Sequence, residues 1–207
     1  MTVAEDLAVG TALSTVIATT DADNGLDGSV RYEVVSGAGP YFDLAYDTGI
    51  VTLVTALDRE TSLTHVVIIR AVDAGTTPNA KSATATLSVS VTDVNDVTPT
   101  CAPSIIVLSL AEGMAAGSSL VTLSCSDADL DPNNINNKIG YAISAGNGAG
   151  YFAVDALSGE LSLSGSAALD YETTKAYTLT VTATDAGTPP LSTEVGVTVS
   201  ITGEMSR

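Results

Sequence analysis

The stretch Asp93-Val94-Asn95-Asp96-Val97-Thr98-Pro99 lies at mid-chain and places two aspartates three positions apart, with an asparagine between them. Carboxylates this close repel one another unless a cation lies among them. Ca²⁺ binds about six to eight oxygen ligands from carboxylates, amide oxygens and backbone carbonyls, and this run offers all three kinds. We therefore interpret the run as a metal-bound joint between two domains.

The composition is strongly acidic but typical of a folded β-protein. The formal net charge is −17 over 207 residues, with only 7 lysines and arginines. This charge argues against nucleic-acid partners and anionic membrane surfaces, because both require basic patches. A disordered acidic tail is excluded because 45% of the residues are hydrophobic. Tryptophan is absent, so we expect a core of Val, Leu, Ile, Ala and Thr, which favours β-sheet.

The sequence contains no obvious membrane or export segment. No apolar run reaches the ~18 residues that span a bilayer, and the start of the chain lacks the pattern of a signal peptide. If the protein is extracellular, we expect this chain to be a fragment of a longer one.

The two halves of the chain repeat one another. The offset between matched residues runs from 106 (Asp21 to Asp127) to 112 (Glu60 to Glu172). A period of this length indicates tandem globular domains, because solenoid repeats are about 20–50 residues long. We expect domains at residues 1–97 and 98–207. The matched segments are Glu5 with Glu112, Asp21-Ala22-Asp23 with Asp127-Ala128-Asp129, Tyr41-Phe42 with Tyr151-Phe152, Leu57-Asp58-Arg59-Glu60 with Leu169-Asp170-Tyr171-Glu172, and Ala71–Thr76 with Ala183–Thr188.

Within each half, apolar and polar residues alternate with a period of two. Val67, Ile69 and Ala71 share one predicted face, and residues 177–183 continue the same pattern in the second half with threonines on the other face. This alternation is typical of half-buried strands. No stretch has a convincing helical period, so we predict an all-β fold with a β-sandwich in each half.

The recurring motifs together resemble cadherin extracellular repeats over nearly the whole chain. The motifs are the isolated glutamate, the Asp-Ala-Asp pair, Leu-Asp-Arg/Tyr-Glu, Ala-x-Asp-Ala-Gly-Thr with a proline one or two residues later, and the Asp93–Asp96 run. The resemblance implies two tandem seven-stranded Greek-key β-sandwiches of the immunoglobulin-like cadherin type, joined by a linker that binds about three Ca²⁺. The first strand of the first repeat is expected to be truncated. The likeness is to long cadherins of the protocadherin, Fat and Dachsous type.

The resemblance also implies the ligands of three calcium sites. Asn137 is an alternative to Asn136, because Asp131–Ile135 lengthens that loop. The implied ligands are Glu5, Asp58, Glu60 and Asp96 for the first site; Glu5, Glu60, Asp93, Asp96 and Asp129 with the Val94 carbonyl for the second; and Asn95, Asp127, Asp129 and Asp185 with the carbonyls of Val97 and Asn136 for the third.

Partial sites are expected at the two ends of the chain. At the far end, Gly203 and Ser206 occupy the places of Asp93 and Asp96. We therefore expect full calcium occupancy only at the central linker. The residues of these possible partial sites are Asp21, Asp23, Asp73, Glu112, Asp170 and Glu172.

Two other features of the sequence bear on its chemistry. In a cadherin-like sandwich Cys101 and Cys125 would lie near the linker on neighbouring strands, so we favour a disulfide over two buried thiols. His65 matches Tyr177 and is expected to pack in or beside the core. An EF-hand loop starting at Asp127 is excluded, because Pro132 occupies the position of its turn glycine.

The leading functional hypothesis is a calcium-dependent cell–cell adhesion module at the cell surface. Its partners would be other cadherin ectodomains, bound homophilically or heterophilically, and its parent a single-pass membrane protein. One alternative is a non-adhesive, tension-bearing spacer of a large surface protein; another is a bacterial calcium-stabilised surface repeat. We do not expect an enzyme or a small-molecule substrate, because no catalytic constellation accompanies His65 or the carboxylates.

Overall fold

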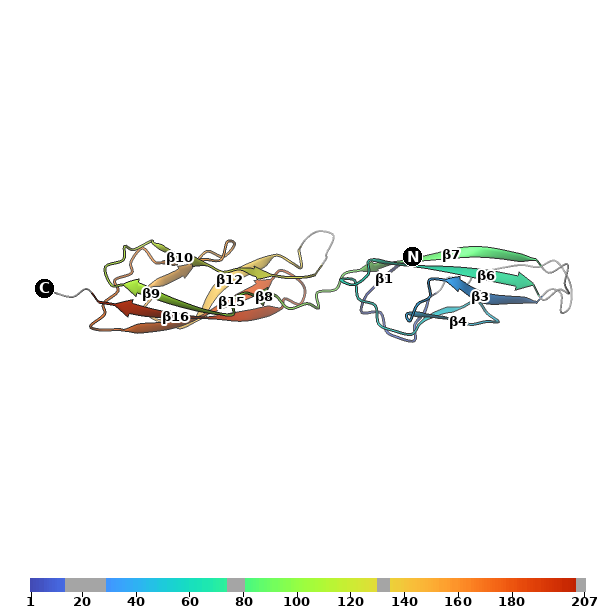
Figure 1. The fold of residues 1–207 in the computed structure, drawn as a ribbon, viewed down its shortest axis with the longest axis horizontal. Coiled ribbons are helices and arrows are strands. Elements are labelled where there is room, and N and C mark those ends of the chain that lie inside the picture. The colour runs from blue at the N-terminus through green and yellow to red at the C-terminus, as the bar shows by residue number, and fades with distance from the viewer. Residues whose placement is uncertain (14–28, 74–80, 130–134, 204–207) are drawn as a thin grey trace. The chain divides into compact units, whose positions relative to one another are not determined.

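The computed structural model describes residues 1–13, 29–73, 81–129 and 135–203, and every regular element in these ranges is a β-strand (Figure 1). The chain divides into two compact units, Met1–Val94 and Asn95–Arg207. Asp21, Asp23 and Ser206, named above, lie outside the described residues. The all-β prediction is confirmed for the part of the chain that the structure describes.

The first unit is a sandwich of two sheets. One sheet has the strand order β1-β7-β6-β3, and the other has the order β2-β5-β4. The strands are β1 (Thr2–Ala4), β2 (Ala12–Leu13), β3 (Val30–Ser36), β4 (Phe42–Leu44), β5 (Val51–Leu53), β6 (Thr64–Asp73) and β7 (Ser82–Thr92).

The second unit repeats this plan with a more complete first strand. Its large sheet has the order β12-β15-β16-β9, its second sheet the order β10-β14-β13, and a short ladder pairs β11 with β8. The strands are β8 (Thr100–Cys101), β9 (Ile105–Ala111), β10 (Ser119–Thr122), β11 (Cys125–Ser126), β12 (Ile139–Ala145), β13 (Phe152–Val154), β14 (Glu160–Leu163), β15 (Ala176–Asp185) and β16 (Ser192–Thr202).

The first strand of each unit pairs in parallel with the last one. In the first unit Val3 lies opposite Val91, and in the second unit β9 runs beside β16 from Ile105 to Ala111. All other described ladders are antiparallel. The strand β1 is only 3 residues long against 7 for β9.

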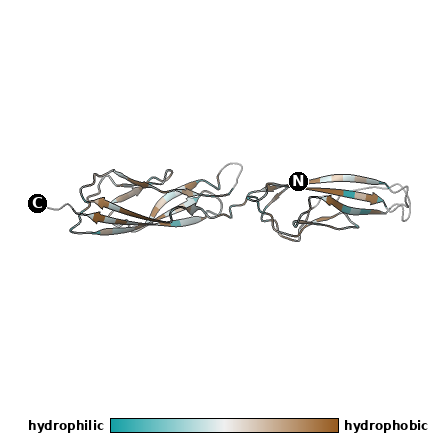
Figure 2. Ribbon diagram, viewed as in Figure 1, coloured by the Kyte–Doolittle hydropathy of each residue, from teal (hydrophilic) through white to brown (hydrophobic). Residues whose placement is uncertain are grey.

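The alternation of the long strands places one face of each in the core. Leu179, Val181 and Ala183 are fully buried, and Val67 and Ile69 are equally enclosed in the first unit, whereas the threonines between the core residues of β15 are partly or fully exposed. Hydrophobic and hydrophilic stretches both colour the long strands (Figure 2). Burial of aliphatic side chains, at about 1.5–3 kcal/mol each, is the main stabilising contribution to such cores. The strand prediction is therefore confirmed at residue level.

The same hydrogen bond from a strand to the turn that follows β4 or β13 recurs in both units and fixes which residues correspond. The backbone N–H of Tyr32 donates to the carbonyl of Tyr46 at 2.8 Å, and that of Tyr141 donates to Ala156 at 3.0 Å. Gly159 ends the second turn with φ near +71°, and a Cβ there would lie 3.0 Å from the Tyr141 ring. A glycine is therefore required, both for its backbone conformation and for space.

Candidate metal centre

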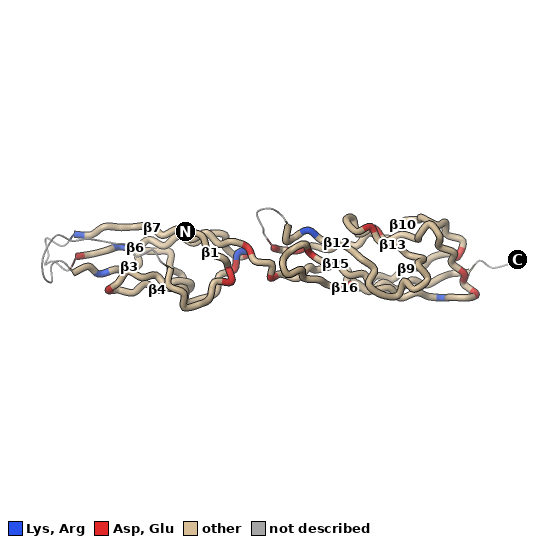
Figure 3. Tube along the Cα trace, turned by 180° about the vertical axis from the view of Figure 1, so that it is seen from behind, with Lys and Arg blue, Asp and Glu red and all other residues tan. Residues whose placement is uncertain are grey.

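Most of the described acidic residues lie in loops at the ends of strands (Figure 3). The acids within strands are Glu33, Asp43, Asp73, Glu160, Asp185 and Glu194. In the first unit, Glu5 follows β1, and Asp58 and Glu60 lie in the loop between β5 and β6. Carboxylate oxygens of these three residues all lie within 4.8 Å of one another. Such a set suits a hard divalent cation, which prefers carboxylate oxygens.

Glu5 is held in this group by two backbone donors. Its Oε2 accepts a hydrogen bond from the Arg59 N–H at 2.8 Å, and its Oε1 accepts one from the Val94 N–H at 2.7 Å. The side chain is 4% exposed. Because each carboxylate oxygen has two lone pairs, both atoms can still bind a metal while they accept these bonds.

Asp58 lies at a turn that favours its ionised form. Its carboxylate accepts hydrogen bonds from the backbone N–H and the hydroxyl of Thr61, each at 2.9 Å. These bonds hold the pKa of Asp58 below its ordinary value. The carboxylate is therefore charged and pre-oriented before any cation binds.

An ion pair that sequence reasoning missed lies beside the acidic group. The Nε atom of Arg59 is 4.0 Å from Oδ1 of Asp93, and both side chains are largely buried. Arg59 lies between Asp58 and Glu60 in the Leu-Asp-Arg-Glu motif, so the sequence alone does not indicate a pairing with the distant Asp93. The pair connects the loop after β5 to the residue that follows β7.

In the second unit, Asn95 lies against the loop that follows β15. Its Nδ2 donates to Oδ2 of Asp185 at 3.2 Å and to the Pro189 carbonyl at 2.7 Å. A Cβ on Gly187 would lie 2.0 Å from the Asn95 side chain. The glycine of the Ala-Gly-Thr-Pro motif therefore makes room for the asparagine.

The Asp127–Asp129 pair is ordered by backbone bonds of the same kind. Oδ1 of Asp127 accepts from the Asp129 N–H at 2.9 Å, and Oδ1 of Asp129 accepts from the Val97 N–H at 3.2 Å. Asp129 is fully buried. A buried carboxylate needs strong compensating partners, and a metal ion is one such partner.

Two buried acceptor atoms test whether a cation fits. Oδ1 of Asn95 and Oδ2 of Asp127 are buried and have no hydrogen-bond partner among the described residues. Buried oxygens are rarely left in this state, and a bound cation would supply the missing partner of both. The donor set of this unit, made of carboxylates and an amide oxygen, is therefore compatible with Ca²⁺.

The cadherin domain family matches residues 1–92 and 106–202, which is most of both units. The chain belongs to the cadherin family. Human protocadherin Fat 1 is 35% identical over 202 residues, a match that covers 98% of this chain and 4% of that protein. The fat-like cadherin-related tumor suppressor homolog of Drosophila melanogaster is 34% identical, with 97% of this chain and 4% of that protein covered.

Solved cadherin structures share the fold. A structure of mouse cadherin-23 EC22-24 has a TM-score of 0.84 and 30% identity, covering 99% of this chain and 62% of that one. A structure of protocadherin gamma B2 extracellular cadherin domains 1-5 has a TM-score of 0.83 and 28% identity, covering 98% of this chain and 38% of that one. These comparisons confirm two cadherin repeats of the extracellular kind. Cadherin domains are non-enzymatic adhesion modules that as a class bind calcium, so this chain is not an enzyme.

The far end of the second cadherin repeat is built differently from the linker end of the first. Glu112 Oε2 accepts from the Tyr171 N–H at 3.0 Å, as Glu5 does from Arg59. Tyr171 stands where the first repeat has Arg59, and the Lys175 ammonium lies 5.1 Å from the centroid of its ring. Among the described residues at this end, Glu112, Asp170 and Glu172 do not form a group spaced to hold a metal.

Asp73 belongs to the opposite end of the first cadherin repeat. It closes β6, and its Oδ2 accepts from the Lys81 N–H at 2.8 Å. Its expected companions Asp21 and Asp23 lie outside the described residues, so a site here stays a prediction.

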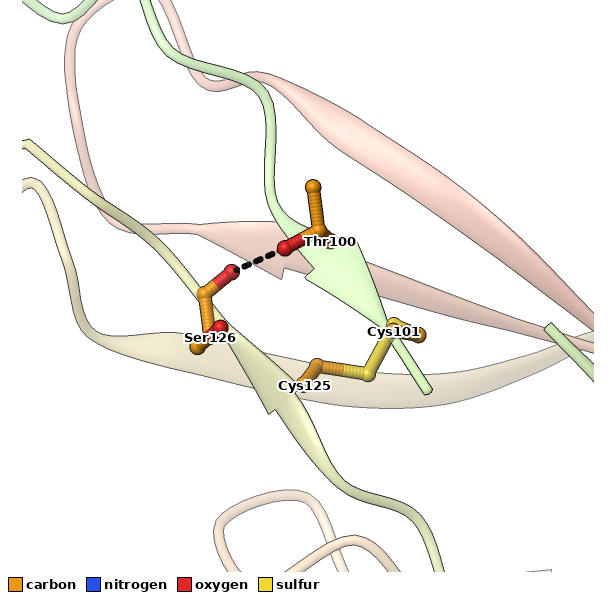
Figure 4. The surroundings of a disulfide bond; sticks show 4 residues. All are labelled: Thr100, Cys101, Cys125 and Ser126. Carbon is orange, nitrogen blue, oxygen red and sulfur yellow. Dashed lines mark hydrogen bonds between the residues drawn. A yellow bond between two sulfur atoms is a disulfide. The ribbon is translucent and has the colours of Figure 1, made fainter. Parts of the chain in front are cut away.

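Cys101 and Cys125 form the predicted disulfide in the second cadherin repeat (Figure 4). The two residues lie opposite each other in the β8–β11 ladder, and the Thr100 hydroxyl donates to the Ser126 carbonyl beside them. The bond therefore ties the first, short piece of the first strand to the residues just before Asp127.

His65 packs against aromatic side chains. Its ring centroid lies 4.6 Å from that of Tyr41 and 5.5 Å from that of Phe42. Tyr177 contacts Tyr151 and Phe152 in the same way in the second repeat. Burial lowers the pKa of His65. The expectation that it packs beside the core is confirmed.

Proposed function

We propose that this chain is a calcium-dependent cell–cell adhesion module, in which Ca²⁺ rigidifies the linker between two repeats of a long cell-surface ectodomain. The observation that carries the proposal is the pair of buried oxygens without a donor, Asn95 Oδ1 and Asp127 Oδ2, at the start of the second repeat. Asn95 lies in the Asp93–Asp96 run and Asp127 in the Asp-Ala-Asp pair of the second repeat, and carboxylate and amide oxygens are ligands that calcium prefers.

The proposal assigns about three Ca²⁺ to the linker. Glu5, Asp58 and Glu60 come from the first repeat, and the Asp93–Asp96 run lies between the repeats. Asp127, Asp129, Asp185 and the carbonyls of Val97 and Asn136 come from the second. The eight carboxylates carry about −8, against +6 from three ions. Without the ions their mutual repulsion would disfavour a rigid linker.

The partners proposed are other cadherin ectodomains, homophilic or heterophilic, and the parent protein is proposed to be single-pass and membrane-anchored. The family membership and the extracellular neighbours support this proposal. A second candidate is a non-adhesive spacer. The length of the relatives favours the spacer, because this chain spans only about 4–7% of the first curated relatives that it matches.

Calorimetric titration with Ca²⁺ tests the ligand assignment. We expect about three ions per native chain at affinities near the ~10⁻⁴–10⁻³ M typical of extracellular modules. Asp127→Asn keeps the side-chain shape but removes a charge, and should lose at least one ion. Asp43→Asn, an exposed acid on β4, is the matched control and should bind as the native chain does. Equal stoichiometry for Asp127→Asn and native protein would contradict the assignment.

Bead aggregation separates the adhesion module from the spacer. Beads coated with the chain should aggregate in Ca²⁺ and disperse in chelator if the module is adhesive. Beads that bind Ca²⁺ but stay dispersed would favour the spacer.

A further inference from the structure

The two repeats differ sharply at one equivalent place on the outer face of the large sheet. The ladder pairs Glu33 with Arg70 in the first repeat and Ala142 with Thr182 in the second. The shared hydrogen bonds from Tyr32 to Tyr46 and from Tyr141 to Ala156 establish that these positions correspond. The repeats therefore allow a comparison of the same surface with two sets of side chains.

In the first repeat this place is filled by charged and aromatic side chains. Arg70 and Glu33 form an ion pair, and the Arg31 guanidinium lies 5.7 Å from the Tyr46 ring centroid. The remaining hollow has a volume of about 260 Å³. Long charged side chains keep such a surface hydrated and discourage self-association.

In the second repeat every one of these side chains is small. Gly140 replaces Arg31, Ala142 replaces Glu33, Thr182 replaces Arg70 and Ala156 replaces Tyr46. The hollow is larger, with a volume of about 450 Å³. Leu157 stands at its rim and is 87% exposed, the most exposed large apolar side chain among the described residues.

The surrounding sheet face is almost free of charge. Along β12, β15, β16 and β9 the outward positions carry Gly, Ala, Ser, Thr, Ile and Val, with Glu194 as the one outward acid of these described strands. Asp185 at the end of β15 is buried, and it lines one end of the hollow together with Lys138. Ile105 and Val107 on this face are 67% and 73% exposed. In a chain of net charge −17, two copies repel over most of their surface. On this face, with Glu194 as its one outward acid among the described strand residues, that repulsion is weak.

We propose that the outer face of the β12-β15-β16-β9 sheet binds a second copy of this chain, with Leu157 of each copy entering the hollow of the other. An exposed knob and an adjacent hollow on one surface are what a two-fold, self-complementary interface requires. A cavity of about 150 Å³ can hold a benzene molecule, so this hollow has room for a leucine side chain.

The area of the face predicts a weak dimer. Four strands about 4.8 Å apart and about 23 Å long give roughly 400 Å² per copy. The total is below the ~1,200 Å² of standard stable interfaces, so we expect micromolar or weaker affinity. This proposal names a partner for the proposed adhesive function and rests on it.

Sedimentation equilibrium of the full chain in Ca²⁺ tests the proposal. We expect a concentration-dependent monomer–dimer equilibrium. Leu157→Asp and Ala142→Glu install the residues that the first repeat carries at these places, Asp47 and Glu33, and each should weaken dimerisation at least tenfold. Leu63→Asp changes an exposed leucine of the first repeat and should leave the dimer unchanged.

Two results would overturn the proposal: a native chain that stays monomeric at the highest concentration, or variants that dimerise as the native chain does. Melting of each variant in Ca²⁺ verifies that it is folded. Loss of the calcium response in the native chain would instead refute the metal linker and not this surface, so the two failures are distinguishable.

Discussion

Glu5 contributes to the stability of its repeat as well as to the proposed metal centre. It accepts hydrogen bonds from Arg59 and Val94 and so ties the loop after β5 to the end of β7. The sequence predicted Glu5 as a ligand from its recurrence as Glu112. It could not predict the structural role, because backbone donors are invisible in a pattern of side chains.

Replacing Glu5 by alanine should destabilise the first repeat even without calcium. Two backbone N–H groups would lose their acceptor, at a cost of about 1–3 kcal/mol. Urea unfolding in chelator, followed by amide NMR signals of each repeat, measures the effect. Glu5→Gln keeps one acceptor oxygen and should cost less, whereas equal stability of Glu5→Ala and native protein would contradict this role.

His65 should make the first repeat sensitive to mild acid. Its folded pKa lies below the unfolded value of about 6.5, so the unfolded chain takes up the proton first. Stability should therefore fall as the pH drops from about 6.5 toward the folded pKa. His65→Tyr copies Tyr177 of the second repeat and should remove this component of the pH dependence, as measured by melting between pH 5 and 8. Melting points that change with pH in the same way for the native protein and His65→Tyr would contradict this prediction.

At the scale of elements, the strands were predictable and their connections were not. Alternation identified the buried faces of β6 and β15, because side chains in a strand change sides at every residue. The parallel pairing of β9 with β16 and the split of the first strand into β8 and β9 depend on contacts distant in sequence. The hollow beside Leu157 was not predictable either. A comparison of the two repeats in sequence shows that charged residues are replaced by small ones, but it does not show the space that they leave.

The disulfide should stabilise the second repeat selectively. It closes a loop of 24 residues in sequence separation, worth about 3 kcal/mol in the chain-entropy model. The double variant Cys101→Ser with Cys125→Ser should lower the melting point of the second repeat and leave the first unchanged, as followed by NMR signals of each. A second repeat that melts at the same temperature in the native chain and in the double variant would contradict this expectation.

At the scale of the whole molecule, the central claim is that calcium couples the two repeats of this cadherin chain. The carboxylates proposed as ligands were identified from the sequence because their motifs recur twice. Their hydrogen bonds and the Arg59–Asp93 ion pair became visible only in the structure. The domain boundaries predicted from the sequence, residues 1–97 and 98–207, stay a proposal. The two compact units of the structure are Met1–Val94 and Asn95–Arg207.

The most direct test is thermal melting with saturating Ca²⁺ and with chelator, on the native chain and on Asp96→Ala. A ligand that binds only the folded state stabilises it by about 2.7 kcal/mol per site at 100 times its Kd. We predict that Ca²⁺ raises the melting point of the native chain and that Asp96→Ala largely loses this rise, while Asp43→Ala keeps it. Identical melting of all three proteins in both conditions would contradict the account.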